Sequence, residues 1–543
     1  LFQSNLIMFT NRLITLTRPG AYLLALILIF FLFTPAKGQN VAKPIASWLE
    51  AHRPIADFVP VSLFQEAAES TGFQQIAQNS QVLELDDKAI TALQLAPPSA
   101  LQFSIPTADG ATLELELIQV EILGADFFVS TNTQEQVAYK PAVHYRGIVR
   151  GNPQSIACIS LSNEGVMGMV SDENGVFELG QLEDGSGRYL YYPTQQLQAL
   201  SPNHCFAEEE SLFPSNDDAP AAGDRGVGCK TVQVYFECDY KLYTDKGSNT
   251  TTVSNYVTGL FNQIATLYAN ENVGIAISQI YVWTSSDPYV GYSSTSAVLN
   301  AFRQTRGSTF NGNLAHLLTT RSLGGGIAYV DVLCVKQYAF GVSSINTSYQ
   351  NVPTYSWSVE VVTHELGHNL GSWHTQSCNW PGGALDNCVS PEGSCAPGPT
   401  PVNGGTIMSY CHLTGHGINF TKGFGPSPGG RIRDKVLSAT CVTQSGTVPG
   451  GLSTANITAN SATLNWNPVQ GATSYTVQYK LSSAGSWILA GNSSSATFNL
   501  TGLVNNSAYQ WQVKTDCSNY SVTASFTTGT GGGGGGISPY LFV

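Results

Sequence analysis

Charged side chains are scarce in this chain of 543 residues, since Asp, Glu, Lys and Arg together make up 11% of it and the formal net charge is −13. This balance argues against nucleic acid or an anionic membrane surface as the main partner. No segment after the first apolar stretch is apolar enough to span a bilayer. The chain is longer than one ordinary core requires, so several domains are expected.

The first 38 residues have the pattern of a secretory signal peptide. Arg12 and Arg18 precede an apolar run over residues 21–33, and the small residues Ala36 and Gly38 follow it. A run of about 13 apolar residues is short for a membrane span, although a membrane anchor is the alternative. We therefore expect cleavage before Gln39, a secreted protein and no stable span after signal removal.

Histidine and methionine are also rare, at 9 and 4 residues, yet three of the histidines lie in the stretch WSVEVVTHELGHNLGSWH over residues 357–374. This stretch fills every fixed position of the pattern HExxHxxGxxH. A pattern with five specified residues is much more specific than a bare HExxH. The alternative, a helix with unrelated surface histidines, does not account for this spacing.

The spacing has a mechanical reason. On an α-helix, His364 and His368 lie four residues apart on one face and can hold one metal ion. Gly371 can take a positive φ, end the helix and let His374 supply a third nitrogen. Three histidines leave one tetrahedral position for water, which predicts a single catalytic Zn2+ with Glu365 as the general base.

Eleven cysteines in an exported chain predict disulfides and at least one unpaired thiol. Four of them lie beyond the third histidine without a CxxC spacing, which favours disulfides over a second metal site: Cys378, Cys388, Cys395 and Cys411. Cys205 lies in a linker rich in Pro, Ser, Asp and Glu. Its thiolate can occupy the open zinc position, or it can pair with Cys158.

Hydrophobic periodicity divides the chain into a mostly β region, an α/β region and a second β region. Alternating runs over residues 113–123 and 176–180 predict strands in the first. In the second, strands and helices alternate before the histidine stretch. The predicted strands cover 230–243, 273–285 and 313–320, and the predicted helices cover 253–269 and the segment SSTSAVLNAFRQTRG.

Two further segments carry a family resemblance together with the histidine motif. The segment HYRGIVRGNPQSIACISLSNEGVMGMVSDENGVFELGQL over residues 144–182 resembles a reprolysin or adamalysin propeptide. GGTIMSYCHL over residues 404–413 resembles the Met-turn of the metzincins, the larger class to which these proteases belong. The resemblance implies an inhibitory propeptide with Cys205 as its switch cysteine, and Met408 as an apolar floor beneath the three imidazoles.

The resemblance also implies a substrate-binding edge strand. GGGIAYVDVLC over residues 324–334 is similar to the strand above the cleft in this family, where an extended peptide adds to the sheet. The main-chain groups expected to hold the substrate belong to Ile327, Ala328, Tyr329 and Val330. An ordinary buried strand is the alternative. The resemblance further implies a disulfide between Cys334 and Cys441.

Three positions depart from the reprolysin pattern. Thr375 follows the third histidine where family members usually have Asp, and Gln233 stands where a calcium-binding glutamate is common, so calcium is unsupported. Tyr410 stands where proline is frequent, and it is similar to the tyrosine of the astacin and serralysin branches. Tyr410 is therefore an auxiliary catalytic candidate, with a packing tyrosine as the alternative.

The last part of the chain resembles a fibronectin type III sandwich. Short alternating strands begin near residue 451, and Trp466, Tyr475, Leu503 and Tyr509 occupy positions similar to the core of that fold. The fold leaves function open, and we expect a module that binds protein or polysaccharide. Six glycines over 531–536 predict a flexible tail.

The sequence thus predicts a multidomain protein with a mostly β prodomain, an α/β metzincin-like catalytic domain and a β-sandwich. The predicted boundaries are a signal peptide over 1–38, a propeptide with linker over 39–228, a catalytic domain over 229–445, a fibronectin type III domain over 446–530 and a tail over 531–543. The predicted activity is that of a secreted zinc endopeptidase acting on proteins or peptides. The alternatives are an astacin-like or serralysin-like protease and an adhesion protein with a degenerate zinc domain.

Overall fold

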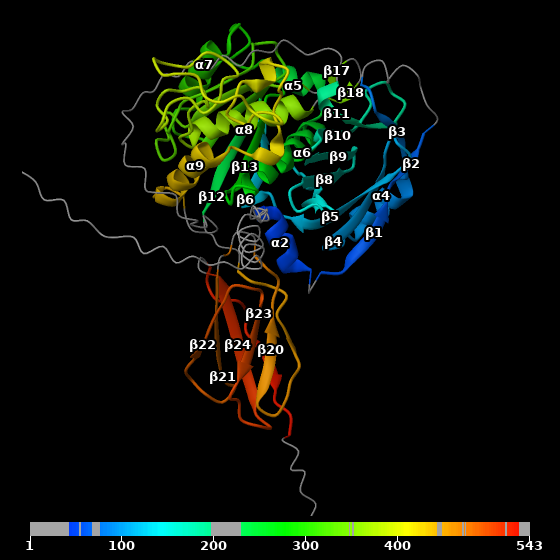
Figure 1. The fold of residues 1–543 in the computed structure, drawn as a ribbon, viewed down its shortest axis with the longest axis vertical. Helices are drawn as coiled ribbons and strands as arrows, with labels where there is room; N and C mark the ends of the chain where they lie inside the picture. The colour runs from blue at the N-terminus through cyan, green and yellow to red at the C-terminus, as the bar shows by residue number, and fades with distance from the viewer. Residues whose placement is uncertain are drawn as a thin grey trace, which may run out of the picture. The chain divides into compact units, whose positions relative to one another are not determined.

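The computed structural model describes residues 43–53, 56–67, 77–196, 230–442 and 448–530, except for 347, 350, 351, 354, 470, 471, 473, 516 and 517 (Figure 1). The predicted signal peptide, Cys205 and the glycine tail lie outside these residues. In the described part of the chain, none of the helices has the length and apolar character needed to cross a membrane.

Residues 43–196, here called the N-terminal region, are built around one large sheet. Ten described strands form it in the order β1-β4-β5-β7-β8-β9-β10-β11-β3-β2, and every neighbouring pair is antiparallel except β1 with β4. The alternating runs of the sequence become its strands, and apolar side chains such as Phe103 and Ile159 form a core of their own. The strands are β1 (Phe58–Ser62), β2 (Phe64–Glu66), β3 (Gln81–Leu85), β4 (Ala100–Pro106), β5 (Thr112–Val120), β7 (Val143–Val149), β8 (Ile156–Ser162), β9 (Gly165–Asp172), β10 (Gly175–Gln181) and β11 (Tyr189–Pro193). The helices are α2 (Pro44–His52), α4 (Asp87–Leu95) and the 3-10 turn η1 (Thr194–Gln196).

Residues 230–442, here called the central unit, contain a second, mixed sheet. Its order is β15-β16-β14-β12-β13-β6, with β15 antiparallel to β16 and the remaining neighbours parallel. The central strands are buried along most of their length because both faces of the sheet are covered. The strands are β12 (Thr231–Cys238), β13 (Gly274–Val282), β14 (Leu314–Thr319), β15 (Gly326–Ala328) and β16 (Phe340–Ser344), and the short pair β17 (Ser348–Tyr349) and β18 (Val352–Pro353) follows.

The sixth strand of this sheet, β6 (Leu123–Thr131), comes from the N-terminal region. The chain leaves the ten-stranded sheet after β5, pairs in parallel with β13, and returns as β7. A domain boundary at residue 229 was predicted from the sequence, and it remains a prediction. Strand β6 lies before this boundary and pairs with β13, which lies after it, so the two parts share a sheet.

Helices pack on the mixed sheet at the places where the sequence predicted them. The helix α6 (Thr250–Ala269) packs against β13 and against α8 (Tyr355–Asn369), which lies against β15 and β16. The helix α7 (Thr295–Arg306) also packs on these two strands. Side-chain caps begin α6 and α7, because Asn249 accepts from Thr251 and Thr252 and Ser294 accepts from Ala297. The first predicted strand is shorter than expected, since Asp239 caps a short helix, α5 (Tyr240–Asp245), directly after it.

After α8 the central unit has little regular structure. It contains the 3-10 turns η2 (Cys411–Leu413) and η3 (Phe420–Lys422) and one helix, α9 (Pro426–Ser438). Disulfides hold this segment, as the cysteine pattern predicted: Cys334–Cys441, Cys378–Cys395 and Cys388–Cys411. The first pairing is the one implied by the family resemblance. Cys158 and Cys238 are buried and free, so Cys158 is not paired with Cys205 in this structure.

Residues 448–530 form a β-sandwich, as predicted. One sheet has the order β19-β20-β23 and the other β22-β21-β24-β25. Trp466, Tyr475, Leu503 and Tyr509 are buried in its core, and the Tyr509 hydroxyl accepts a hydrogen bond from the Val504 amide. The strands are β19 (Ser453–Ala455), β20 (Ser461–Asn465), β21 (Tyr475–Leu481), β22 (Ile488–Ser493), β23 (Thr497–Thr501), β24 (Ala508–Thr515) and β25 (Ala524–Thr527).

Candidate functional site

Three imidazoles converge at the end of α8. Nε2 of His368 lies 3.1 Å from Nε2 of His364 and 3.1 Å from Nε2 of His374, and all three side chains are buried. His364 and His368 come from one face of the helix. The helix ends two residues before Gly371, whose φ of +98° turns the chain and brings His374 back to the other two.

The hydrogen bonds of the ring Nδ1 atoms determine which ring nitrogen carries the proton. Nδ1 of His364 lies 2.8 Å from Ile407 O, Nδ1 of His368 lies 2.9 Å from Ser372 O, and Nδ1 of His374 lies 2.8 Å from Glu392 Oε1. A carbonyl or carboxylate oxygen can only accept, so each Nδ1 carries the proton. In this tautomer the three Nε2 atoms face the same point.

The positions of the three Nε2 atoms can be compared with those expected around a bound metal ion. Burial lowers the pKa of His364 and His368 well below the ordinary value, and the neighbouring imidazoles lower it further. Three lone pairs that face one another in a buried site repel unless a cation lies between them. Two nitrogens bound to a tetrahedral zinc at 2.0–2.1 Å are about 3.3 Å apart, close to the observed separations. The site fits zinc.

Met408 and its neighbours contact the end of α8 and the segment that follows it. Its sulfur would lie 2.8 Å from a Cβ placed on Gly367, so the turn packs directly against the last turn of α8. The side chain is fully buried. The carbonyl of the preceding residue, Ile407, holds His364, and the carbonyl of Met408 accepts the amide of Thr375 at 3.1 Å.

Glu365 lies beside the histidines and next to the edge strand. Its side chain is buried, and neither carboxylate oxygen has a hydrogen-bond partner among the described residues. Burial raises its pKa well above the ordinary value. A Cβ on Gly326 of β15 would collide with its Oε1, so only glycine lets the strand approach this closely.

The strand β15 lies at the edge of the mixed sheet, and its register with β16 shows which of its main-chain groups point away from the sheet. The Tyr329 amide donates to Phe340 O and the Ser344 amide donates to Gly325 O, so Ile327 pairs inward with Val342. In an antiparallel ladder, alternate residues bond to the same neighbour. The outward main-chain groups therefore belong to Gly326 and Ala328. Ile327 and Tyr329 face β16, and Val330 lies beyond the strand.

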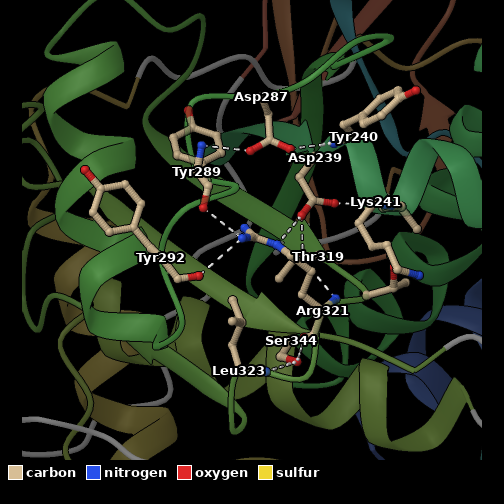
Figure 2. Close-up of polar contacts among 12 residues, drawn as sticks. Asp239, Tyr240, Lys241, Asp287, Tyr289, Tyr292, Thr319, Arg321, Leu323 and Ser344 are labelled. Atoms are coloured by element: carbon tan, nitrogen blue, oxygen red, sulfur yellow. Dashed lines mark hydrogen bonds and ion pairs between the residues drawn. The ribbon is translucent and has the colours of Figure 1, made fainter.

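A buried ion pair holds the loop that enters this strand. Figure 2 shows the Arg321 guanidinium among Asp239, the Tyr289 carbonyl and the Tyr292 carbonyl. Its Nε donates to Asp239 Oδ2 at 3.0 Å. Ser344 joins the loop to β16, because its hydroxyl donates to Arg321 O and accepts from Leu323 N. These contacts position the segment that leads to Gly326.

Tyr410 also lies at the histidines, since its hydroxyl is 3.0 Å from Nε2 of His374. The structure also adds Glu392, which the sequence reasoning missed. Its Oε1 accepts from Gln376 Nε2 at 2.8 Å as well as contacting His374. Glu392 follows His374 by 18 residues in an irregular segment, and no motif or periodicity marks it.

Comparisons with known proteins agree with this geometry. Residues 229–419 match the reprolysin-type family model described as Metallo-peptidase family M12, and residues 447–528 match the fibronectin type III domain. Similar solved structures include domains A168–A170 of titin, at 21% identity over 15% of this chain and 32% of that chain, with a TM-score of 0.14. A structure titled "Myokine structure" matches at 18% identity over 16% of this chain and 99% of that chain, with a TM-score of 0.15. By its family matches, the chain carries a reprolysin-type metallopeptidase domain of family M12, followed by a fibronectin type III domain.

Proposed function

We propose that this protein is a secreted, zinc-dependent endopeptidase made as a zymogen. The observation that carries the proposal is the convergence of three buried imidazoles, with Nε2 separations of 3.1 Å, beside the unpaired carboxylate of Glu365. A binding protein with a degenerate zinc domain has no need of a base at this position. The intact Glu365 therefore favours catalysis over adhesion.

His364, His368 and His374 would hold the ion. When bound, zinc supplies a Lewis acid that polarises the peptide carbonyl and makes a water molecule more acidic. Glu365 accepts the proton as the water oxygen forms its bond to the carbonyl carbon. The same carboxyl then gives that proton to the leaving nitrogen as the C–N bond breaks.

The edge strand supports an extended substrate. The outward amide and carbonyl groups of Gly326 and Ala328 can pair with the main chain of a peptide, as in other cases of strand addition. Because Gly326 lies against Glu365, a peptide bound there would place its carbonyl near the base. Tyr410 can donate its hydroxyl hydrogen to the developing oxyanion, which is the feature shared with astacin-like enzymes.

The zymogen proposal draws on the N-terminal region. This region contacts α6 through specific polar bonds, for example from Asn262 Nδ2 to Ile159 O at 3.2 Å and from Arg146 Nε to Thr266 Oγ1 at 2.9 Å. Cys205, the proposed switch cysteine, lies outside the described residues. The disulfides of the central unit are consistent with export. The fibronectin type III domain is proposed to bind protein or polysaccharide.

The decisive experiment is Glu365→Ala in the mature protein. We expect cleavage of a denatured protein substrate to fall by at least 100-fold, because general acid–base catalysis contributes about 10²–10⁴. Zinc content, measured by atomic absorption, should stay at the wild-type level. Cleavage at an unchanged rate would contradict the mechanism, and loss of zinc together with activity would show that Glu365 has a structural role.

The proposed switch is tested by Cys205→Ala in the unprocessed protein. Removal of a thiolate that occupies the open metal position should raise the activity of the full-length form towards that of the mature form. Cys158→Ala is the matched control, since its thiol is buried and free in the N-terminal region. Equal activity of the two variants would assign Cys205 another role.

A further inference from the structure

The N-terminal region does more than cover the central unit, because it completes its sheet. Strand β6 pairs in parallel with β13 from Leu123 opposite Ile277 to Thr131 opposite Val282. Val129 of β6 is 1% exposed and belongs to the same apolar core as the central sheet. Side chains reinforce the pairing, since Gln279 Nε2 donates to Ser130 Oγ at 2.7 Å.

The end of β6 is also fixed. Asn132 Oδ1 accepts from both the amide and the hydroxyl of Thr284, at 2.8 and 2.9 Å, and its Nδ2 donates to Ser285 Oγ at 2.7 Å. Removal of β6 would leave β13, with the apolar sequence GIAISQIYV, as an open edge. A long apolar edge with unpaired amides and carbonyls is a site of aggregation.

A second contact reaches the histidine helix itself. The buried carboxylate of Glu178, on β10, accepts a hydrogen bond from the amide of Ser356 in the first turn of α8 and another from the Tyr192 hydroxyl. The first amides of a helix have no partner within the helix, and a carboxylate is favourable at this end. The N-terminal region thus supplies a cap to the helix that carries His364, Glu365 and His368.

Contacts along α6 also join the two parts. The polar side chains of Asn255, Thr258, Asn262 and Thr266 meet the N-terminal region, and all four are buried. Ile156 and Met169 of the N-terminal region belong to the same apolar core as the buried side chains of α6. Separation of the two parts would expose this core as well as the edge of β13 and the first turn of α8.

We propose that the N-terminal region stays bound to the central unit as a structural subunit after the linker is cut, anchored by β6 and by Glu178. The inference rests on the proposed function only in taking the linker that ends at residue 228 as the place of cutting. Activation then leaves β6 in the sheet, and a strand of residues 123–131 persists in the mature enzyme.

The test uses the full chain with Glu365→Ala, so that its outcome does not depend on proteolytic activity. A recognition site for a sequence-specific protease is inserted between Leu212 and Asp218, and the cut protein is run on size-exclusion chromatography without denaturant. The two fragments should elute together at low micromolar concentration. Elution as separate fragments would overturn the proposal.

Variants then identify the anchor. Val129→Asp places a charge in the shared core and should raise the dissociation constant of the fragments at least tenfold, whereas Asp126→Ala, at an exposed position of the same strand, should leave it unchanged. Asn132→Ala is the milder variant if Val129→Asp does not fold. Dissociation constants equal to wild type for both would show that β6 is not the anchor.

Hydrogen exchange on the cut protein provides an independent measurement. Amides over residues 277–282 should exchange as slowly as in the uncut chain, because β6 still covers them. Glu178→Gln should speed exchange in the first turn of α8 and leave residues 277–282 unaffected. Fast exchange over residues 277–282 in the cut wild-type protein would contradict the proposal even if the fragments elute together.

Discussion

The two parts of the central unit that meet at the histidines are stabilised differently. Residues 230–369 form a sheet with packed helices, and their stability comes from apolar burial around side chains such as Phe236 and Phe261. Residues 371–442 have little regular structure, and each disulfide found among the described residues has at least one cysteine beyond His374. The proposed metal site would take two ligands from a core-stabilised helix and one from a cross-linked segment.

The difference has a physical origin. A helix and a sheet satisfy their own backbone hydrogen bonds and bury apolar faces, so packing alone can hold them. A segment of turns buries less apolar surface per residue, and cross-links compensate by restricting its unfolded states. His374 depends on the second kind of stabilisation, and so does Glu392, whose backbone pairs with Gln376 and Cys378.

The largest expected effect is a loss of stability from a core substitution in residues 230–369. Phe261→Ala removes a fully buried ring of α6 that contacts Phe236 at a centroid distance of 5.5 Å. The loss in the free energy of unfolding should be about 3–5 kcal/mol, measured by urea denaturation. Val290→Ala, at a side chain that is 67% exposed, is the control and should change little. Similar losses in both variants would contradict the assignment of the core.

A somewhat smaller effect is expected in the second part. The double variant Cys378→Ser with Cys395→Ser opens a loop with a sequence separation of 17, for which the chain-entropy model gives about 3 kcal/mol. Thermal denaturation should show a lower midpoint, and added reductant should no longer shift it by as much as in wild type. Cys238→Ala removes a thiol outside any disulfide and should keep the full response to reductant.

The smallest expected effect concerns Glu392, which lies in residues 371–442 and contacts the ring of His374. Glu392→Ala should weaken metal binding by about 10–100-fold, because carboxylates that orient a ligating histidine typically contribute that much. Glu392→Gln keeps an acceptor without the charge and should lose less. The measurement is the rate at which a chelator removes zinc, with the exposed Glu135→Gln as control. Zinc loss at the wild-type rate in both Glu392 variants would exclude this positioning role.

The sequence predicted the helix-borne part of the site well, because its chemistry depends on local spacing. His364 and His368 lie on one face whenever residues 355–369 form a helix, and Gly371 is the residue suited to the turn that follows. Strand alternation likewise predicted the β-sandwich and the strands of the central sheet. The segment predicted to bind substrate contains β15, at the edge of the sheet, and its binding role stays a prediction. The direction of its main-chain groups requires the pairing with β16, which the sequence does not contain.

What the sequence determined by itself is the set of groups with a fixed local geometry: the histidine helix with Glu365, the turn at Gly371 and the core positions of the sandwich. Only the tertiary structure decided that β6 joins the sheet of the central unit, that Glu178 caps α8 and that Glu392 contacts His374. These contacts join residues between 18 and 178 positions apart. No periodicity encodes such distances, because they follow from how whole sheets and cross-linked turns pack together.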